Sequence, residues 1–291
     1  MLSTLEPITP QLLKAYGVAG FTVAAYDRGS LALNEAFGHT AEPTPSALRR
    51  DACFCLASLT KPLVARLVLD LVESGDLDLD RPLFDYVPLD HIAESPWWRK
   101  VTARTALSHS TGLPFRFSAP GKPFTLEFEP GSRFQYSSDA YIYLQIVMES
   151  LTGAPLANLA RSNLLAPLGM GSSGFSVEDL PAAHWAAGRP AAAPSLLWAS
   201  GGLWSTATDF GAFVSSVLRG DSLSPALHKE IFRPQVDAGF GTGWGLGWGL
   251  CGSKGAEHIF HFGFDGTYRN YVQADPAIND MVVILTNGHA G

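Results

Sequence analysis

The sequence has little charge and no long apolar run. Charged side chains make up 16% of its 291 residues and hydrophobic ones 46%, whereas ~25% charge is typical of soluble domains. This balance predicts a large, well-filled core. The formal net charge is −7 without a basic run, so nucleic acid is not expected as a partner. No stretch reaches the ~18 apolar residues of a membrane span, so none is expected.

Cysteine is scarce, and no secretion pattern is visible. The three cysteines are an odd number, which does not indicate a disulfide framework. Cys53 and Cys55 lie in an apolar run, so we expect buried thiols. Residues 1–10 do not combine a basic start with an apolar run, as a secretory signal would. A reducing cytoplasmic location is therefore predicted; a periplasmic one is the alternative if a leader has been removed.

Several familiar site patterns are missing. There is no His-Glu-x-x-His, and no Gly-x-Ser-x-Gly as in α/β-hydrolases. Residues 247–252 match Gly-x-Gly-x-x-Gly but open no helix, so a nucleotide site is not expected. His258 and His261 are an odd number apart, so on a strand they face opposite sides and cannot share a metal. We expect neither metal nor cofactor.

What the sequence does contain is Ser58-x-x-Lys61 at the start of a predicted helix. Pro62, which lacks an N–H, belongs in a first helical turn. Residues three apart share one helix face, so the Lys61 amine can reach the Ser58 hydroxyl and, once desolvated, take its proton. The alternative is that Ser58 merely caps the helix. An apolar stripe at helical spacing then continues through Leu63, Val64, Leu67, Val68, Leu71 and Val72, with Gly75 as the cap.

The order of predicted elements indicates an α/β (α+β) fold. We expect the strands at both ends of the chain to join one antiparallel sheet flanked by helices, with a helical lobe inserted. The predicted sheet lobe comprises residues 1–75 and 200–291, and the mostly helical lobe residues 76–199. We expect a pocket at the seam. The predicted strands are residues 20–25, 31–38, 53–56, 244–250, 258–262, 268–274 and 281–286, and the main later helices are 137–151 and 209–218.

Two further stretches gain meaning from their order. Tyr136-Ser137-Ser138 opens a helix, and His261-Phe262-Gly263 ends a strand. Singly, each is explained by packing. In sequence after Ser58-x-x-Lys61 they resemble the serine β-lactamase-like superfamily, whose motifs are Ser-x-x-Lys, Tyr-x-Asn and Lys-Thr-Gly or His-x-Gly. The closest branch joins class C β-lactamases, D-alanyl-D-alanine peptidases and family VIII-type serine esterases. Secondary resemblances cover residues 107–114, 130–131 and 201–206, with Asp209 and Tyr268.

The resemblance implies an acyl-enzyme mechanism. Ser58 would attack a carbonyl carbon and become acylated. Lys61 and Tyr136 would form the base system that passes the Ser58 proton to the leaving group and later activates water. Intact Ser58, Lys61 and Tyr136 argue against the alternative of a different class, a non-catalytic penicillin-binding-like protein.

The resemblance also implies an oxyanion hole and reveals two departures. The backbone N–H groups of Ser58 and Phe264 would stabilise the oxyanion, with Gly263 allowing close approach. Ser138 stands where the family has Asn, and His261 replaces the Lys of β-lactamases. His261 would orient the Tyr136 hydroxyl or the substrate, but offers less positive charge to a substrate carboxylate.

These departures favour an esterase of small acyl esters. The alternatives are a β-lactamase, a D-amino-acid amidase or D-peptidase, and an acyltransferase. The expected partner is a small-molecule ester, amide or β-lactam; the sequence leaves the natural substrate and the oligomeric state open.

Overall fold

The computed structural model describes residues 7, 9–41, 44–89, 95–115, 125–180, 184–187, 198–252 and 257–288. The chain forms two compact units. Unit 1 comprises Met1–Thr60, Arg161–Arg219 and Phe260–Gly291, and unit 2 comprises Lys61–Ala160 and Gly220–Ile259. Each unit therefore combines segments that are far apart in the sequence. The lobe boundaries predicted at residues 75 and 199 stay predictions.

Helices and short strands alternate along the chain. The α-helices are α2 (Thr9–Tyr16), α3 (Thr60–Ser74), α4 (Ala103–Leu107), α5 (Ser138–Thr152), α6 (Leu156–Ala160), α7 (Trp198–Gly201), α8 (Ala207–Arg219) and α9 (Pro225–Ile231). The strands are β1 (Gly20–Asp27), β2 (Ser30–Gly38), β3 (Ala52–Cys55), β4 (His184–Trp185), β5 (Trp204–Ser205), β6 (Val236–Gly239), β7 (Thr242–Trp244), β8 (Gly249–Cys251), β9 (His258–Phe264), β10 (Arg269–Asp275) and β11 (Asp280–Thr286).

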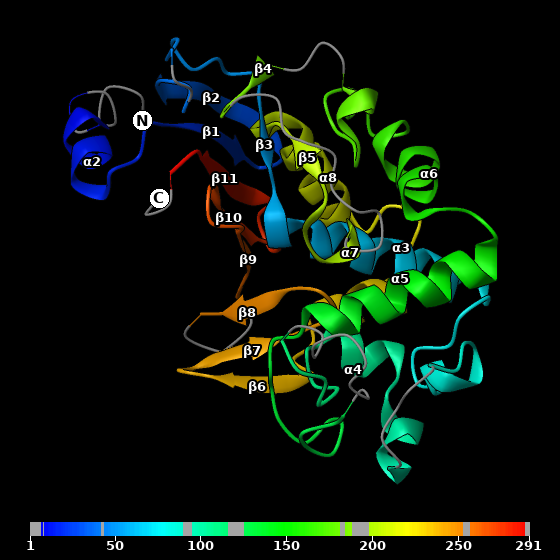
Figure 1. The fold of residues 1–291 in the computed structure, drawn as a ribbon. Helices are drawn as coiled ribbons and strands as arrows, with labels where there is room; N and C mark the ends of the chain where they lie inside the picture. The colour runs from blue at the N-terminus through cyan, green and yellow to red at the C-terminus, as the bar shows by residue number, and fades with distance from the viewer. Residues whose placement is uncertain are drawn as a thin grey trace. The chain divides into compact units, whose positions relative to one another are not determined.

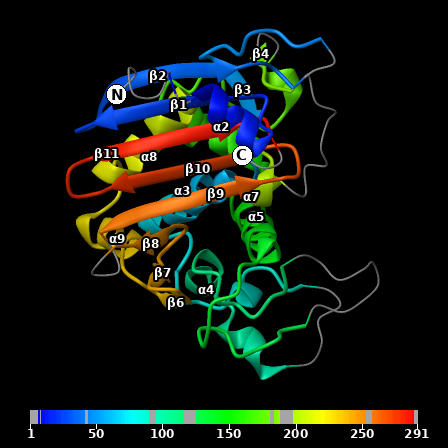
Figure 2. The same cartoon turned by 90° about the vertical axis from the view of Figure 1, so that its left-hand side faces the viewer.

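The main sheet has eight strands in the order β2-β1-β11-β10-β9-β8-β7-β6. Strand β1 runs antiparallel to β2 and β11, and β10 runs antiparallel to β11. In unit 1, α8 covers one face of these strands, burying Phe210, Phe213 and Val214, and α2 lies on the other face (Figures 1 and 2). The strands from the two ends of the chain thus join one antiparallel sheet flanked by helices, which confirms the predicted fold class.

One predicted strand is wrong. Residues 244–250 were expected to form a single strand, but they form the end of β7, a turn, and the start of β8. Gly247 explains the break, because its φ of +88° lies in the left-handed region that interrupts an extended strand. A side chain there would also meet the Ala65 Cβ at 2.4 Å. A further strand, β6, pairs with β7 and was not predicted.

Helix α3 is buried on every side along its first half. The sequence predicted one apolar stripe, but every residue from Lys61 to Leu69 is buried. A helix with apolar contacts all round belongs in a protein interior rather than on its surface. Its end agrees with prediction: Gly75 has a φ of +82°, and its N–H donates to the Val72 carbonyl at 3.1 Å.

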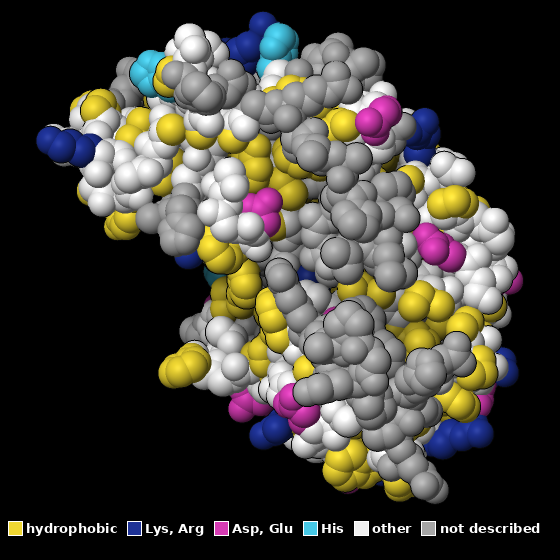
Figure 3. Space-filling model, viewed as in Figure 1, with side chains coloured by type: hydrophobic (Ala, Val, Ile, Leu, Met, Phe, Trp, Pro, Cys, Tyr) yellow, Lys and Arg dark blue, Asp and Glu magenta, His cyan; other side chains and the backbone are white. Residues whose placement is uncertain are grey.

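The described surface carries scattered charge. In the face displayed by Figure 3, acidic and basic side chains lie singly or in small groups among hydrophobic ones. Within the described ranges, no helix has the length and apolar character needed to cross a bilayer.

Candidate active site

Ser58 lies in a tight turn between β3 and α3. The 3₁₀ turn spans Ala57–Leu59, and Ala57 has a φ of +49°, a conformation that residues other than glycine rarely adopt. From Ala52 to Leu69, Ser58 is the single residue that is not buried. Such strained backbone persists only where its surroundings hold it, and it is enriched at active sites. The turn therefore leaves Ser58 partly exposed within a buried run.

A neighbouring segment clamps this turn. The Thr60 hydroxyl donates to the Ala57 carbonyl at 2.7 Å and accepts from the Leu203 N–H at 3.0 Å. The Leu56 N–H in turn donates to the Leu203 carbonyl at 2.8 Å. These bonds satisfy the polar groups that the strained turn would otherwise bury unpaired.

The third predicted motif packs against the Ser58 turn. A Cβ on Gly263 would lie 2.1 Å from the Leu56 carbonyl oxygen and 3.3 Å from the Leu59 nitrogen. Only glycine allows this approach of β9 to the turn. Asn270 adds a second tie, because its Nδ2 donates to the Cys55 carbonyl at 2.8 Å. Unit 1 thus brings Gly263, which directly precedes Phe264, against the backbone that carries Ser58.

His261 is completely buried in β9. Its Nδ1–H donates to the Phe262 carbonyl at 2.9 Å, because a carbonyl can only accept. The side chain therefore does not present a cation to solvent. Its predicted role in orienting Tyr136 or the substrate stays a prediction.

Unit 2 brings Lys61 and Tyr136 together. Lys61 lies in the first turn of α3 with no exposed surface. Its Nζ lies 5.0 Å from the ring centroid of Tyr136 and 5.7 Å from that of Tyr141, within the range of cation–π attraction. The amine and the phenol predicted to form the base system are thus neighbours.

The cap of α5 fixes the segment that carries Tyr136. The Ser137 hydroxyl accepts from the Ala140 N–H at 3.1 Å and donates to the Pro114 carbonyl at 2.8 Å. Such an N-cap contributes about 1 kcal/mol to a helix. Ser138, the first residue of α5, is buried, and its N–H donates to the Phe115 carbonyl at 3.0 Å. Tyr136 itself is half-buried just before the cap.

Three side chains around Tyr136 were not predicted as site residues. The His109 ring stacks on Tyr136 at 4.1 Å between centroids, and Trp244 meets it edge-on at 6.0 Å. Tyr141 was predicted only as part of an apolar helix face. Residues 107–114 were noted in the sequence, but nothing local indicated that His109 would reach Tyr136.

The surroundings of Tyr141 do not favour proton transfer through its hydroxyl. Its hydroxyl donates to the Leu107 carbonyl at 3.3 Å. Complete burial raises the pKa of Tyr141 well above its usual value, and the charge of an ionised Tyr136 would raise it further. Two tyrosines thus flank Lys61: Tyr141 is completely buried, whereas Tyr136 is half-buried with its hydroxyl oxygen inside the protein.

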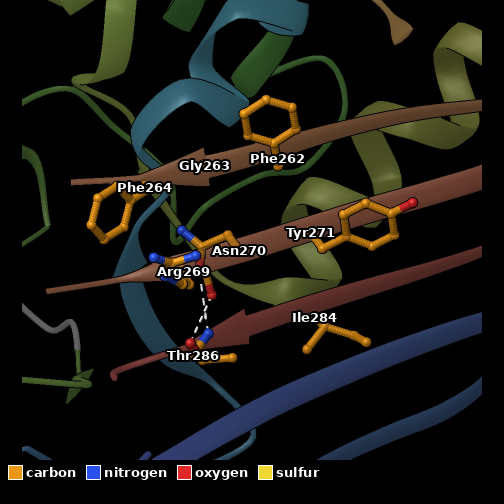
Figure 4. Close-up of a pocket in the computed structure, with 8 residues that line it drawn as sticks. All are labelled: Phe262, Gly263, Phe264, Arg269, Asn270, Tyr271, Ile284 and Thr286. Carbon is orange, nitrogen blue, oxygen red and sulfur yellow. Dashed lines mark hydrogen bonds between the residues drawn. The ribbon is translucent and has the colours of Figure 1, made fainter. Parts of the chain in front are cut away.

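A hollow of about 360 Å³ lies on the exposed face of the unit 1 sheet (Figure 4). It is distinct from the Ser58 turn, because β9 alternates: Gly263 faces Leu56, whereas Phe262 and Phe264 point to the exposed face. The Arg269 guanidinium lies 4.4 Å from the Phe264 ring centroid. The residues that line the hollow are Phe262, Gly263, Phe264, Arg269, Asn270, Tyr271, Ile284 and Thr286.

Burial also makes the two cysteines before Ser58 unreactive. It raises the pKa of Cys53 and of Cys55 far above the usual thiol range. Both are free thiols, as predicted. Among the residues that the structure describes, no three His, Cys, Asp or Glu side chains gather as a metal site would require.

Comparisons with known proteins agree with this architecture. Esterase EstB from Burkholderia gladioli is 30% identical over 208 residues, which cover 60% of this chain and 52% of that protein. The octameric penicillin-binding protein homologue from Pyrococcus abyssi superposes with a TM-score of 0.84 at 22% identity, covering 100% of this chain and 74% of its own. The D-alanine carboxypeptidase AmpC from Burkholderia cenocepacia superposes with a TM-score of 0.78 at 18% identity, and the match covers 99% of this chain and 94% of that protein.

The family model called Beta-lactamase matches residues 5–291, nearly the whole chain. This protein therefore belongs to the Beta-lactamase family and has its serine hydrolase-type fold.

Proposed function

We propose that this protein is a serine esterase that hydrolyses small acyl esters through an acyl-Ser58 intermediate. The observation that carries the proposal is the approach of a fully buried amine to a phenol ring: Lys61 Nζ lies 5.0 Å from the Tyr136 ring centroid. Lys61 follows Ser58 by three residues at the start of α3. A serine needs such a neighbouring base before it can act as a nucleophile.

In the proposed reaction the base system of Lys61 and Tyr136 takes the Ser58 hydroxyl proton as Oγ attacks the ester carbonyl carbon. The backbone N–H groups of Ser58 and Phe264 stabilise the oxyanion. The C–O bond of the leaving alcohol then breaks, the alcohol receives the proton, and acyl-Ser58 remains. Water, deprotonated by the same base system, attacks the acyl carbon, and the carboxylic acid leaves as Ser58 is restored.

The preference for esters rests on Ser138 and His261. β-Lactams and peptide C-termini carry a carboxylate, which a cation at the third motif would attract. His261 is fully buried here, and its Nδ1–H is engaged by the Phe262 carbonyl. Ser138 is also buried and has a shorter side chain than Asn. The similarity to EstB supports the same preference, although it covers about half of that protein.

Substrate turnover tests the proposal. The wild type should hydrolyse p-nitrophenyl acetate or butyrate faster than nitrocefin, and a fluorophosphonate probe should label it but not Ser58→Ala. Faster nitrocefin or D-amino-acid amide turnover would replace the esterase by a β-lactamase or amidase. Acyl transfer to an added alcohol in preference to water would indicate an acyltransferase. No labelling of the wild type would support a binding protein. The cytoplasmic location stays a prediction.

A further inference from the structure

His109 ends the cap of helix α4 in a left-handed backbone conformation. It follows α4 with a φ of +54° and no exposed surface. Its N–H donates to the Ala106 carbonyl at 3.2 Å, and the Ser110 N–H donates to the Thr105 carbonyl at 2.8 Å, which is the bonding pattern of a left-handed helix C-terminal cap. The contacts that His109 makes beyond this cap indicate what else the residue does.

His109 forms hydrogen bonds with both sequence neighbours of Tyr136. Its carbonyl oxygen accepts from the Gln135 N–H at 2.8 Å, and its ring Nδ1 accepts from the Ser137 N–H at 3.1 Å. One residue thus ties down Gln135 and Ser137, the two neighbours of Tyr136 in the chain. Because both bonds come from a single buried residue, the backbone of Tyr136 cannot rotate without breaking at least one of them.

The imidazole also positions the phenol ring. It stacks on Tyr136 at 4.1 Å with an interplanar angle of 27°, and Trp244 meets the imidazole edge-on at 5.2 Å. The same Tyr136 ring lies 5.0 Å from Lys61 Nζ. The backbone clamp and the stack therefore act on the group that the proposed mechanism places next to its amine.

The hydrogen bond to Ser137 determines the form of His109 that can do this. Nδ1 must carry a lone pair to accept from an N–H, so the single proton of the neutral imidazole lies on Nε2. A ring without an acceptor at this position, or a proton added at Nδ1, would remove the hydrogen bond from the Ser137 N–H.

We propose that His109 is a positioning residue that holds Tyr136 in the orientation required for proton transfer. The inference rests on the proposed function, since it assigns catalytic work to Tyr136. His109 acts on Tyr136 and not on the substrate. Its contribution comes from the acceptor at Nδ1 more than from the ring, because the acceptor fixes the backbone from which the phenol projects.

Two substitutions separate the acceptor from the ring. His109→Asn keeps an acceptor, since Asn Oδ1 is bonded to Cγ as His Nδ1 is, and Asn tolerates the left-handed region. It loses the stack. His109→Phe keeps a flat ring but has no acceptor. Asn is thus the matched control for backbone strain and for loss of the imidazole.

Steady-state kinetics with p-nitrophenyl butyrate, measured between pH 6 and 10, tests the inference. His109→Phe should lose about 10- to 100-fold in kcat with little change in KM, as expected for a displaced catalytic group. The limbs of its pH–rate profile should move, because the proton-transfer geometry changes. His109→Asn should retain kcat within about threefold. An equal loss in both variants, or a kcat for His109→Phe near that of the wild type, would overturn the inference.

An NMR measurement that does not depend on enzyme activity separates this inference from the proposed function. With ¹³Cζ-labelled tyrosine, the Tyr136 resonance is identified by its absence in Tyr136→Phe. It should shift or broaden in His109→Phe and stay sharp in His109→Asn. The resonance of Tyr143, whose hydroxyl donates to the Val87 carbonyl at 2.7 Å, should stay unchanged. An undisturbed Tyr136 in folded His109→Phe contradicts the positioning role whatever the activity. A disturbed Tyr136 in an enzyme that never acylates leaves the positioning role standing and removes the esterase.

Discussion

The segment around Ser58 in unit 1 is built from backbone, whereas the surroundings of Tyr136 in unit 2 are built from side chains. Ser58 stands on a turn that is held by the Leu203 backbone and approached by Gly263, which has no side chain. Tyr136 stands among the rings of His109, Trp244 and Phe115.

The difference follows from what each group must do in the proposed reaction. An oxyanion is stabilised by fixed N–H donors, which the backbone supplies and which close packing keeps rigid. A proton-transfer group needs a particular side-chain environment, which aromatic rings and a buried amine can supply. Substitutions should therefore act through steric displacement near Ser58 and through lost functional groups near Tyr136.

The two phenols beside Lys61 should differ most. Tyr136→Phe should lower kcat/KM for p-nitrophenyl esters by about 10²–10⁴-fold, the usual contribution of a positioned acid or base. Tyr141→Phe should stay within about threefold, since its hydroxyl donates to the Leu107 carbonyl. Initial rates of p-nitrophenyl ester hydrolysis by both purified variants test this prediction. Equal losses would mean that the proton passes through neither phenol in particular.

The steric prediction concerns Gly263. Gly263→Ala would place a Cβ 2.1 Å from the Leu56 carbonyl oxygen, so β9 must move away from the Ser58 turn. Loss of one oxyanion donor typically lowers kcat by about 10²–10³-fold. Gly171→Ala is the matched control, because a Cβ there meets nothing within 4 Å. Full activity in Gly263→Ala would show that the backbone of β9 takes no part in catalysis.

Asn270 should matter for stability. Its Nδ2 donates to Cys55 and its Oδ1 accepts from the Thr286 N–H at 3.3 Å, both buried. Asn270→Ala leaves these backbone groups unsatisfied and should lower the free energy of unfolding by about 1–3 kcal/mol. Denaturant unfolding measures this loss. Gln273→Ala, on the same strand, removes a bond between partly exposed groups and should cost less; the reverse order would contradict the role given to Asn270.

The smallest expected effect is a loss of folding stability at alkaline pH. Burial raises the pKa of Tyr141 in the folded state, while an unfolded tyrosine titrates near 10. Above about pH 10 the unfolded chain releases this proton and the folded chain keeps it, so stability falls as pH rises. The wild type should lose more stability than Tyr141→Phe between pH 9 and 11 in urea titrations. Parallel pH curves for the two proteins would show that Tyr141 titrates normally.

Local signals in the sequence predicted the helices that carry the site. Ser137 caps α5, and Gly153, with a φ of +68°, ends it. Both follow from unpaired backbone groups within one helical turn. The order of the three motifs predicted the family, and the order of the predicted strands and helices predicted one antiparallel sheet flanked by helices.

The sequence did not reveal the contacts that hold the site residues in place. The bond from Ser137 to His109 spans 28 residues, and that from Asn270 to Cys55 spans 215. The left-handed conformation of Ala57 was likewise not predicted, because alanine does not favour it as glycine does. The turn at Gly247 was missed since glycine alone does not distinguish a strand bulge from a break.

The sequence by itself determined which chemical groups this protein carries, their order, and the helices and strands on which they lie, because propensity, capping and periodicity act over a few residues. Only the tertiary structure decided that Lys61 meets Tyr136 rather than water, that Gly263 touches the Ser58 turn, and that His109 holds Tyr136 from both sides. Those contacts join segments whose approach depends on how the whole core packs, and no short stretch of sequence encodes that approach.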